Sequence, residues 1–306
     1  MNEARYRAVE LRLWESLGLT PIEQHVRLSR LGTTARIQEV GAGPTVLFVH
    51  GGSASGANWA PLIPHVHGYR CVLLDRPGCG LSVASGWNLR TLDALNTFAD
   101  ALVVDVLDAL EVPAAHVVST SLGGYFALRG AAAHPERVDR MVEFGYVVGA
   151  PMVHVPISMR AATFPGVRRL TASIPPTRGA TRAILRQLGL GPAMNDGRVS
   201  DELFDWFLSL LRDTPTLRHE AKLPRALLGT GARNAAVLRA DVLSAVRCPI
   251  RFVWGESDPF GGRDIAERFV GRLPDAQLEI WPGSGHAPWI DDPELAAARV
   301  VDFLRG

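Results

Sequence analysis

Short apolar runs that alternate with helical patterns limit most strongly what this chain can fold into. Five runs are rich in Val, Leu, Ile and Phe: TVLFVH at 45–50, RCVLLD at 70–75, AHVVS at 115–119, VDRMVEFG at 138–145 and PIRFVWG at 249–255. Such runs are typical of strands buried on both faces of a parallel sheet. Helical patterns at 92–110 and 122–134 lie between them. We therefore predict an α/β fold with a mostly parallel, doubly wound sheet and right-handed crossovers.

Both ends of the chain add elements to this sheet. Residues 23–40 contain EQHVRLSRL and TTARIQEV around Gly32, a pattern that predicts a hairpin of two strands. A last strand is expected at 277–281, followed by a C-terminal helix at 293–304.

Residues 1–22 predict an amphipathic helix. Its apolar residues are spaced like one face of a helix: Val9, Leu11, Leu13, Trp14 and Leu17. Charged residues interrupt the segment throughout, which excludes the apolar core of a secretion signal. We interpret it as a helix that packs on the core, and a membrane-surface anchor is the alternative.

The alternation of strands and helices fails between about 150 and 235. Prolines and glycines there separate helical pieces such as TRAILRQLG and DELFDWFLSLLR. We interpret 150–235 as a helical cap inserted into a core domain made of 23–149 and 236–306. The inserted segment holds twelve Arg or Lys against six Asp or Glu. Solvated helix faces account for this charge, and a basic cap that favours acidic substrates is the alternative.

Composition restricts the partners and cofactors. With 32 Lys or Arg against 31 Asp or Glu, the net charge of +1 gives no field that attracts nucleic acid or an anionic membrane. No stretch approaches the ~18 apolar residues of a membrane span. The odd set of Cys71, Cys79 and Cys248 indicates no disulfide framework, no zinc site and a reducing, cytoplasmic compartment. Without a dinucleotide fingerprint or a phosphate loop, no cofactor is expected, and the partner is a small molecule.

The segment AHVVSTSLGGYFALRGAAAH carries the strongest signal for function. A strand ends near Ser119, Ser121 follows, and Gly123 opens a helix. A nucleophile on so sharp a turn needs small residues two positions before and after it, and Ser119 and Gly123 meet that need. The turn exposes the Ser121 hydroxyl and leaves the backbone N–H of Leu122 free to donate to an oxyanion. A helix N-cap is the alternative role for Ser121.

This pattern resembles the nucleophile elbow of the α/β-hydrolase superfamily, whose common form is Gly-x-Ser-x-Gly; here Ser119 replaces the first glycine. The resemblance covers about 24–304 and implies an α/β-hydrolase fold with a helical cap and a Ser–Asp–His triad. It also implies that His286 is the base, because the family places its histidine in the loop before the last helix. The sequence GSGHAPW matches that loop. A surface histidine is the alternative.

The same resemblance implies that Asp258, in FVWGESDPF, is the acid that orients His286. The chain order of nucleophile, acid and base is that of the family. Asp291 and Asp292 are rivals by composition, but we interpret them as caps of the last helix. Glu256 is a weaker rival.

The turn in FVHGGSASGANW resembles the family's His-Gly-x turn, which supplies a second oxyanion donor. That donor maps onto the N–H of Gly52, beside the N–H of Leu122. His50 is expected to be a structural hydrogen-bonder, and a catalytic role is the alternative.

The loop LLDRPGCGLS is similar to a structural segment of the family. Asp75 and Gly80 are therefore expected to be turn residues. Cys79 lies in the same loop and is not expected to be the nucleophile.

We predict a serine hydrolase that cleaves a carboxylic ester of a small organic substrate. Ser121 attacks the acyl carbon, His286 transfers the proton, Asp258 fixes the imidazole, and water releases the acyl group. The pocket is expected between the strand ends and the cap. Its candidate residues are Ser53, Trp59, Phe164, Trp206, Phe207, Leu210 and Trp289. A place in the core of the cap is the alternative for Trp206.

Other reactions on this fold remain open. Ser121 argues against the halide-removing and epoxide-opening members, which use Asp as nucleophile. Members that cleave carbon–carbon bonds of ring-fission products use Ser and have a pair similar to Asn58-Trp59. They usually show Trp directly after the histidine, where this chain has Ala287. Acyl transfer or lyase chemistry is a further alternative, and a non-catalytic ligand-binding protein is the last.

Overall fold

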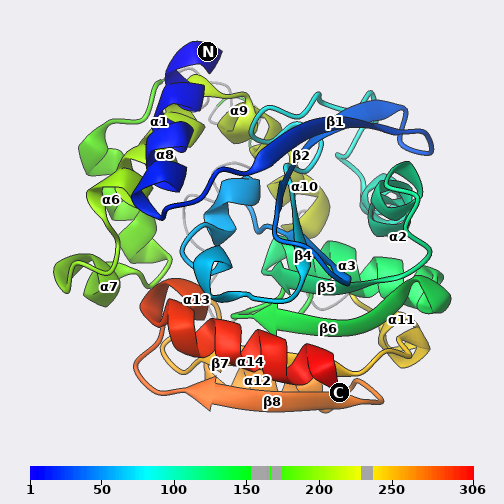
Figure 1. Ribbon diagram of the computed structural model, residues 1–306. Coiled ribbons are helices and arrows are strands. Elements are labelled where there is room, and N and C mark those ends of the chain that lie inside the picture. Colours follow the sequence, from blue (N-terminus) through cyan, green and yellow to red (C-terminus); the bar gives the residue numbers. More distant parts are fainter. Residues whose placement is uncertain (153–163, 165, 167–173, 229–236) are drawn as a thin grey trace.

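The computed structural model describes residues 1–152, 164, 166, 174–228 and 237–306 (Figure 1). At its centre lies an eight-stranded sheet with the strand order β1-β2-β4-β3-β5-β6-β7-β8. The strands are β1 (Ile22–Leu28), β2 (Thr33–Val40), β3 (Thr45–Val49), β4 (Arg70–Leu74), β5 (Ala115–Thr120), β6 (Val138–Phe144), β7 (Ile250–Gly255) and β8 (Ala276–Trp281). The predicted α/β fold is confirmed, and each strand lies within a few residues of its apolar run or hairpin pattern.

Antiparallel pairing at one edge of the sheet gives way to a parallel core. β1 and β2 form the predicted hairpin, with Leu28 paired to Thr33 across the turn at Gly32. β2 also runs antiparallel to β4. From β4 onward the neighbours in the sheet are parallel. The loops that follow the parallel strands therefore leave from the same edge of the sheet, where the predicted site residues lie.

Helices cover both faces of the sheet (Figure 1). One core cluster contains Leu47 and Val49 with residues of α2 (Leu92–Ala109), α3 (Leu122–Ala133), α11 (Ala240–Ala245) and α12 (Arg263–Val270). The other contains Val46 and Phe48 with residues of α1 (Glu3–Ser16) and α14 (Pro293–Arg305). Successive residues of a strand point to opposite faces, so the uninterrupted apolar run of β3 supplies both clusters.

The described part of the predicted insertion, between β6 and β7, is helical. Its helices are α6 (Arg178–Gln187), α7 (Gly191–Asn195), α8 (Asp201–Asp213), α9 (Thr216–Glu220) and α10 (Leu223–Leu228). The side chain of Ser200 caps α8 by accepting the N–H of Leu203 at 3.1 Å. The helices expected from TRAILRQLG and DELFDWFLSLLR are present as α6 and α8. Division of the chain into a core and a separate cap stays a prediction.

The N-terminal helix α1 lies beside α8 at one end of the molecule (Figure 1). Trp206 of α8 donates its Nε1–H to the hydroxyl of Tyr6 at 3.2 Å, and both side chains are fully buried. Arg5 forms an ion pair with Asp213 at the end of α8. These contacts favour packing over a membrane-surface anchor as the role of α1. Among the described residues, no helix is long and apolar enough to cross a membrane.

A buried ion cluster joins α1 to the first strands. Arg36 on β2 donates Nη1–H to Glu10 at 3.1 Å and to Asp75 at 3.2 Å, and its side chain is only 2% exposed. It also donates Nε–H to Glu23 at 2.8 Å. Burial acts to lower the pKa of Arg36, but the carboxylates of Asp75 and Glu10 outweigh it and raise that pKa. The buried charges therefore depend on one another.

We expect Arg36→Ala to lower the free energy of unfolding by about 3–5 kcal/mol, because it leaves Glu10 and Asp75 buried without their cation. Arg30→Ala is the matched control. Arg30 pairs with Asp108 at 2.9 Å, but both side chains are exposed, so the loss is expected to stay below about 1 kcal/mol. Urea unfolding followed by circular dichroism measures both variants. If both variants lost the same free energy of unfolding, the buried ion cluster would not depend on Arg36.

Candidate active site

Ser121 occupies a sharp turn between β5 and α3. β5 ends at Thr120 and α3 begins at Leu122, so one residue makes the turn. Its φ of 56° and ψ of −116° lie in a region that residues with a side chain rarely adopt. Within the described part of α3, the Ser121 hydroxyl makes no capping hydrogen bond. Ser121 therefore does not act as a side-chain cap of α3, and its hydroxyl is not used by the helix.

Glycines around Ser121 allow this turn because neighbouring groups approach closely. A Cβ at Gly123 would lie 2.1 Å from a backbone carbonyl oxygen at the end of β3, and one at Gly124 would lie 2.2 Å from Oε1 of Glu143. Neither position has room for a side chain. A Cβ at Gly51 would lie 3.1 Å from the Cβ of Ser121. The end of β3 and the loop after it thus pack directly against the turn.

His286 and Asp258, the predicted base and acid, lie together. Nδ1 of His286 is 2.7 Å from Oδ2 of Asp258. Asp258 also accepts the backbone N–H groups of Tyr146 at 2.9 Å and Phe260 at 3.0 Å. A carboxylate only accepts, so Nδ1 carries the hydrogen in this contact and Nε2 of the neutral ring keeps its lone pair. The rival Glu256 lies instead in an exposed ion pair.

The loop that carries His286 contacts the inserted segment. The backbone N–H of His286 donates to the carbonyl of Leu188, the residue after α6, at 3.3 Å. The His286 ring packs edge to face on Phe260, with ring centroids 4.8 Å apart. Both contacts restrict the orientation of the imidazole.

Asp291 also fixes this loop. It is the last residue of α13 (Pro288–Asp291), and it accepts the hydroxyl of Ser284 and the N–H of Gly285, the latter at 3.2 Å. The prediction that it caps the last helix is wrong, because α13 is a single turn that returns the carboxylate to the loop. Asp292 does cap α14, accepting an N–H of its first turn at 3.0 Å, as predicted.

His50 holds the loop of residues 50–53, which carries the predicted oxyanion donor Gly52. Its Nδ1 lies 2.8 Å from the carbonyl of Gly51, and its Nε2 accepts the N–H of Arg76 at 3.0 Å. Burial, together with the charge of Arg76, lowers the pKa of His50 well below its ordinary value. His50 is therefore a neutral ring with both nitrogens engaged, in agreement with the predicted structural role.

A buried ion pair that the sequence did not indicate joins α9 to the 50–53 loop. Glu220 accepts the N–H of Ser53 and an Nη2–H of Arg76, each at 3.2 Å. The two charged side chains are 4% (Arg76) and 6% (Glu220) exposed. Arg76 also donates to the carbonyls of His50 at 3.1 Å and Gly51 at 2.8 Å. The inserted segment therefore contacts this loop directly.

The neighbouring Cys79 and Asp75 have structural environments, as predicted. The thiol of Cys79 donates to Glu220 at 3.2 Å, and burial and that carboxylate raise its pKa well above the ordinary value, so it stays protonated. Asp75 accepts the N–H of Gly56 at 2.7 Å and the N–H of Leu81 at 3.0 Å.

Glu143 on β6 is a second group that the sequence did not indicate. Its carboxyl accepts hydrogen bonds from the Ser119 hydroxyl and from the backbone N–H of Ser121. Burial raises the pKa of Glu143 well above its ordinary value despite these bonds. Its Oε1 has no hydrogen-bond partner among the described residues, as expected of a neutral acid rather than a buried charge. Ser119, at the position of the family's usual glycine, is thus the partner of Glu143.

Most of the predicted pocket residues are buried in the core. Their exposed fractions are 0% for Trp59, Trp206 and Leu210, 3% for Trp289 and 6% for Phe207. Trp206 packs against α1, which favours the core alternative for that residue. Trp59 and Trp289 lie with ring centroids 4.7 Å apart. Their role as pocket walls stays a prediction.

The two remaining pocket candidates lie outside the buried core. Phe164 is 65% exposed, and Ser53 is partly buried beside Glu220. Residues 153–163, 165, 167–173 and 229–235 of the predicted cap lie outside the described residues. Among the residues that are described, no cluster of His, Cys, Asp or Glu is arranged to hold a metal ion.

Residues 46–299 match the model of the alpha/beta hydrolase family. The chain belongs to that family. This α/β hydrolase is 28% identical over 298 residues to the 2-hydroxy-6-oxononadienedioate/2-hydroxy-6-oxononatrienedioate hydrolase of Burkholderia vietnamiensis, a match that covers 92% of this chain and 95% of the relative. This match confirms the resemblance to the α/β-hydrolase superfamily.

Solved structures share the fold of this α/β hydrolase. A 2-hydroxy-6-oxo-6-phenylhexa-2,4-dienoate hydrolase from a Rhodococcus species superposes with a TM-score of 0.76 at 18% identity, covering 94% of this chain and 99% of the other. A carboxylesterase from Bacillus subtilis superposes with a TM-score of 0.70 at 20% identity, covering 99% and 98%. At such identities these likenesses establish the fold alone.

We expect the free energy of unfolding of Ser121→Gly to be about 1 kcal/mol higher than that of Ser121→Ala. Both variants lack the hydroxyl, but only glycine adopts the backbone angles of this turn without strain. Equilibrium urea unfolding of the two proteins gives the difference directly. If the alanine variant were as stable as the glycine variant, the turn would carry no strain.

We compare the free energies of unfolding of Glu143→Gln and the native protein. We expect the difference between them to shift in favour of the variant as pH rises from about 4 to about 9. A carboxyl whose pKa is raised on folding contributes its stability below the ordinary carboxyl pKa, and that contribution is lost as pH rises towards the raised value. The amide is neutral throughout and avoids this loss. Urea midpoints across the pH range measure the trend, with the exposed Glu267→Gln as control. A flat difference would contradict a neutral Glu143.

Proposed function

We propose that this α/β hydrolase cleaves a carbon–carbon bond beside the ketone of a 2-hydroxy-6-oxo dienoate, the kind of compound formed by ring fission. The observation that carries the proposal is the similarity, over 92% of this chain, to relatives that are named for hydrolysis of such compounds. Ser121, Asp258 and His286 supply the machinery. These relatives favour the first alternative from the sequence over the ester hydrolysis expected first.

The reaction begins with activation of Ser121. Nε2 of His286 takes the hydroxyl proton. Nδ1–H keeps its hydrogen bond to Asp258 Oδ2, 2.7 Å away, and this carboxylate stabilises the imidazolium. Ser121 Oγ attacks the ketone carbon, C6, and the carbonyl oxygen becomes an oxyanion. The N–H groups of Gly52 and Leu122 donate to it, the latter at the N-terminus of α3, where the helix dipole favours negative charge.

Collapse of this intermediate breaks the bond between C5 and C6. This cleavage takes place on the keto form of the substrate, in which the C2 hydroxyl has lost its proton and C5 has gained one. The electron pair of the broken bond then passes from C5 through the C3–C4 double bond to the C2 carbonyl oxygen. His286 returns its proton to the departing fragment, and the acyl group stays on Ser121. Water, deprotonated by the same histidine, then attacks the acyl carbon and releases a carboxylic acid. One water is consumed: C6 gains OH, C5 gains H, and Ser121 is regenerated.

The charge of the inserted segment supports an anionic substrate. The relative from Burkholderia vietnamiensis is named for a dienedioate, which carries two carboxylates. Residues 150–235 hold twice as many basic as acidic residues. Such an excess of positive charge raises the local concentration of an anion.

Ester hydrolysis is the second candidate, and Ala287 favours it. Carbon–carbon hydrolases of this family usually have Trp directly after the histidine, where this chain has Ala. Trp289, two positions further on, does not stand in for it, because its Nε1–H is committed to the carbonyl of Asn58 at 3.0 Å. An alkoxide leaving group would use the same triad and the same oxyanion donors.

A direct comparison of the two substrates tests the proposal. We expect kcat/KM for 2-hydroxy-6-oxo-6-phenylhexa-2,4-dienoate to exceed that for p-nitrophenyl butyrate by about 100-fold or more, and Ser121→Ala to lose about 1,000-fold or more on the preferred substrate. Loss of the dienoate absorbance and release of p-nitrophenol measure the two reactions.

A higher kcat/KM for p-nitrophenyl butyrate than for the dienoate would instead indicate ester hydrolysis. A fluorophosphonate probe separates the remaining outcomes by intact mass. Labelling of Ser121 that requires His286, without turnover of either compound, would retain an activated serine and reject both substrates. Absence of labelling in the folded protein would reject the serine mechanism itself.

A further inference from the structure

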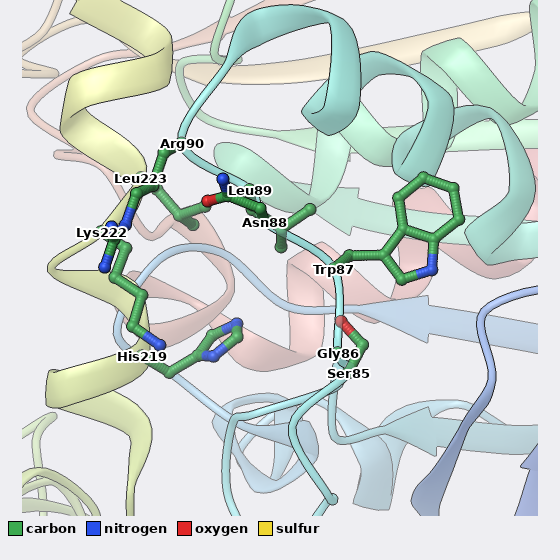
Figure 2. A pocket seen from close by; sticks show the side chains of 9 residues that line it. All are labelled: Ser85, Gly86, Trp87, Asn88, Leu89, Arg90, His219, Lys222 and Leu223. Atoms are coloured by element: carbon green, nitrogen blue, oxygen red, sulfur yellow. The ribbon is translucent and has the colours of Figure 1, made fainter.

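A pocket away from the proposed catalytic residues lies between the loop 85–90 and the helices α9 and α10 (Figure 2). Its volume is about 350 Å³, and its lining residues are Ser85, Gly86, Trp87, Asn88, Leu89, Arg90, His219, Lys222 and Leu223. Ligand sites in proteins start at about 300 Å³. None of the lining residues belongs to the proposed triad or to its oxyanion donors, so this is a separate cavity.

Positive charge lines the pocket. Arg90 and Lys222 are among its lining residues, and no Asp or Glu in the described part of the chain is. Across the described residues, neither cation forms an ion pair with a carboxylate. Other cations of the insertion are compensated: Arg178 pairs with Asp205, and Arg212 with Asp213. Two cations beside one cavity favour an anion there.

Two polar atoms at the pocket lack hydrogen-bond partners. Oγ of Ser85 and Nδ1 of His219 are both buried and unpaired among the described residues. In Figure 2 the ring of His219 points toward the loop that carries Ser85. The ring lies against Gly78, where a Cβ would come within 2.3 Å of Nδ1. Buried polar groups are normally satisfied, so these atoms mark a place where a polar ligand would be bound.

The rest of the lining combines Gly86 and Asn88 with two buried leucines. Leu89 and Leu223 are 6% and 3% exposed. Trp87 contributes its backbone, because its indole points away from His219 and Lys222 (Figure 2) and packs on Phe98 with ring centroids 6.0 Å apart. This contact anchors the loop, and Leu89 and Leu223 give the pocket a small apolar part beside its charged part.

We propose that this pocket binds a small carboxylate with a short apolar tail, with the carboxylate on Arg90 and Lys222 and the tail against Leu89 and Leu223. Leu89 and Leu223 favour such a ligand over inorganic phosphate, which has no apolar part to place against them. Hydrolysis through an acyl-enzyme releases a carboxylic acid whichever bond is cleaved, so the ligand belongs to the chemical class of the products. The site does not depend on which substrate Ser121 attacks.

Isothermal titration of the native protein with acetate, butyrate, hexanoate and inorganic phosphate, at constant ionic strength, tests the site. We expect hexanoate to bind most tightly and the double variant Arg90→Gln/Lys222→Gln to weaken its Kd by about tenfold or more. The matched control is Arg186→Gln/Arg247→Gln, which removes the same charge from exposed positions elsewhere and is expected to leave that Kd unchanged. Each single variant is titrated as well, so that misfolding of the double variant does not decide the result.

Three results would overturn the proposal. The first is absence of binding, and the second is an equal Kd in the pocket variants and the control, which would place the carboxylate elsewhere, the catalytic site included. The third is equal affinity for phosphate, acetate and hexanoate, which means an adventitious ion only. Because binding is measured without turnover, failure of the site and failure of the proposed reaction give different results.

Discussion

Close packing of three segments keeps Ser121 in its left-handed backbone conformation. Gly123 lies against the end of β3, Glu143 fills the space beside Gly124, and the carbonyl of Ser121 accepts the N–H of Val148 at 3.1 Å. A strained residue persists only where its surroundings allow no relaxation. Glu143 completes these surroundings: its carboxyl accepts the Ser119 hydroxyl beside the turn, and burial raises its pKa, which disfavours a negative charge beside the nucleophile.

The inserted segment holds both loops that the proposed reaction needs. Leu188 accepts the N–H of His286, and Glu220 accepts the N–H of Ser53. Each contact is a hydrogen bond to backbone, so a shift of the insertion would move the loop itself and not only a side chain. The Arg76–Glu220 pair is buried, and removing either partner would leave an uncompensated charge. The position of the insertion and the geometry of the 50–53 loop are therefore linked.

Sequence patterns predicted the elements well because burial on both faces of a parallel sheet requires apolar runs, as in β3 and β5. The resemblance to the α/β-hydrolase superfamily implied that Asp258 and His286 lie together, and the loops after β7 and β8 bring the two side chains into contact. Glu143 and Glu220 were missed because nothing local marks a carboxyl whose partners are distant: Glu220 lies 144 residues from Arg76. Asp291 was misassigned because a helix cap and a loop tie look alike in sequence.

The choice between carbon–carbon and ester cleavage depends on the leaving group and not on the triad. The leaving group of an ester is an alkoxide. The leaving group of the dienoate is a carbanion, which needs an electron sink. That sink is the conjugated chain and the C2 oxygen, both of which belong to the substrate. Ala287, where carbon–carbon hydrolases of the family usually have Trp, removes no group that forms or breaks a bond in the proposed reaction. The chemistry proposed for Ser121 therefore stays available to this chain.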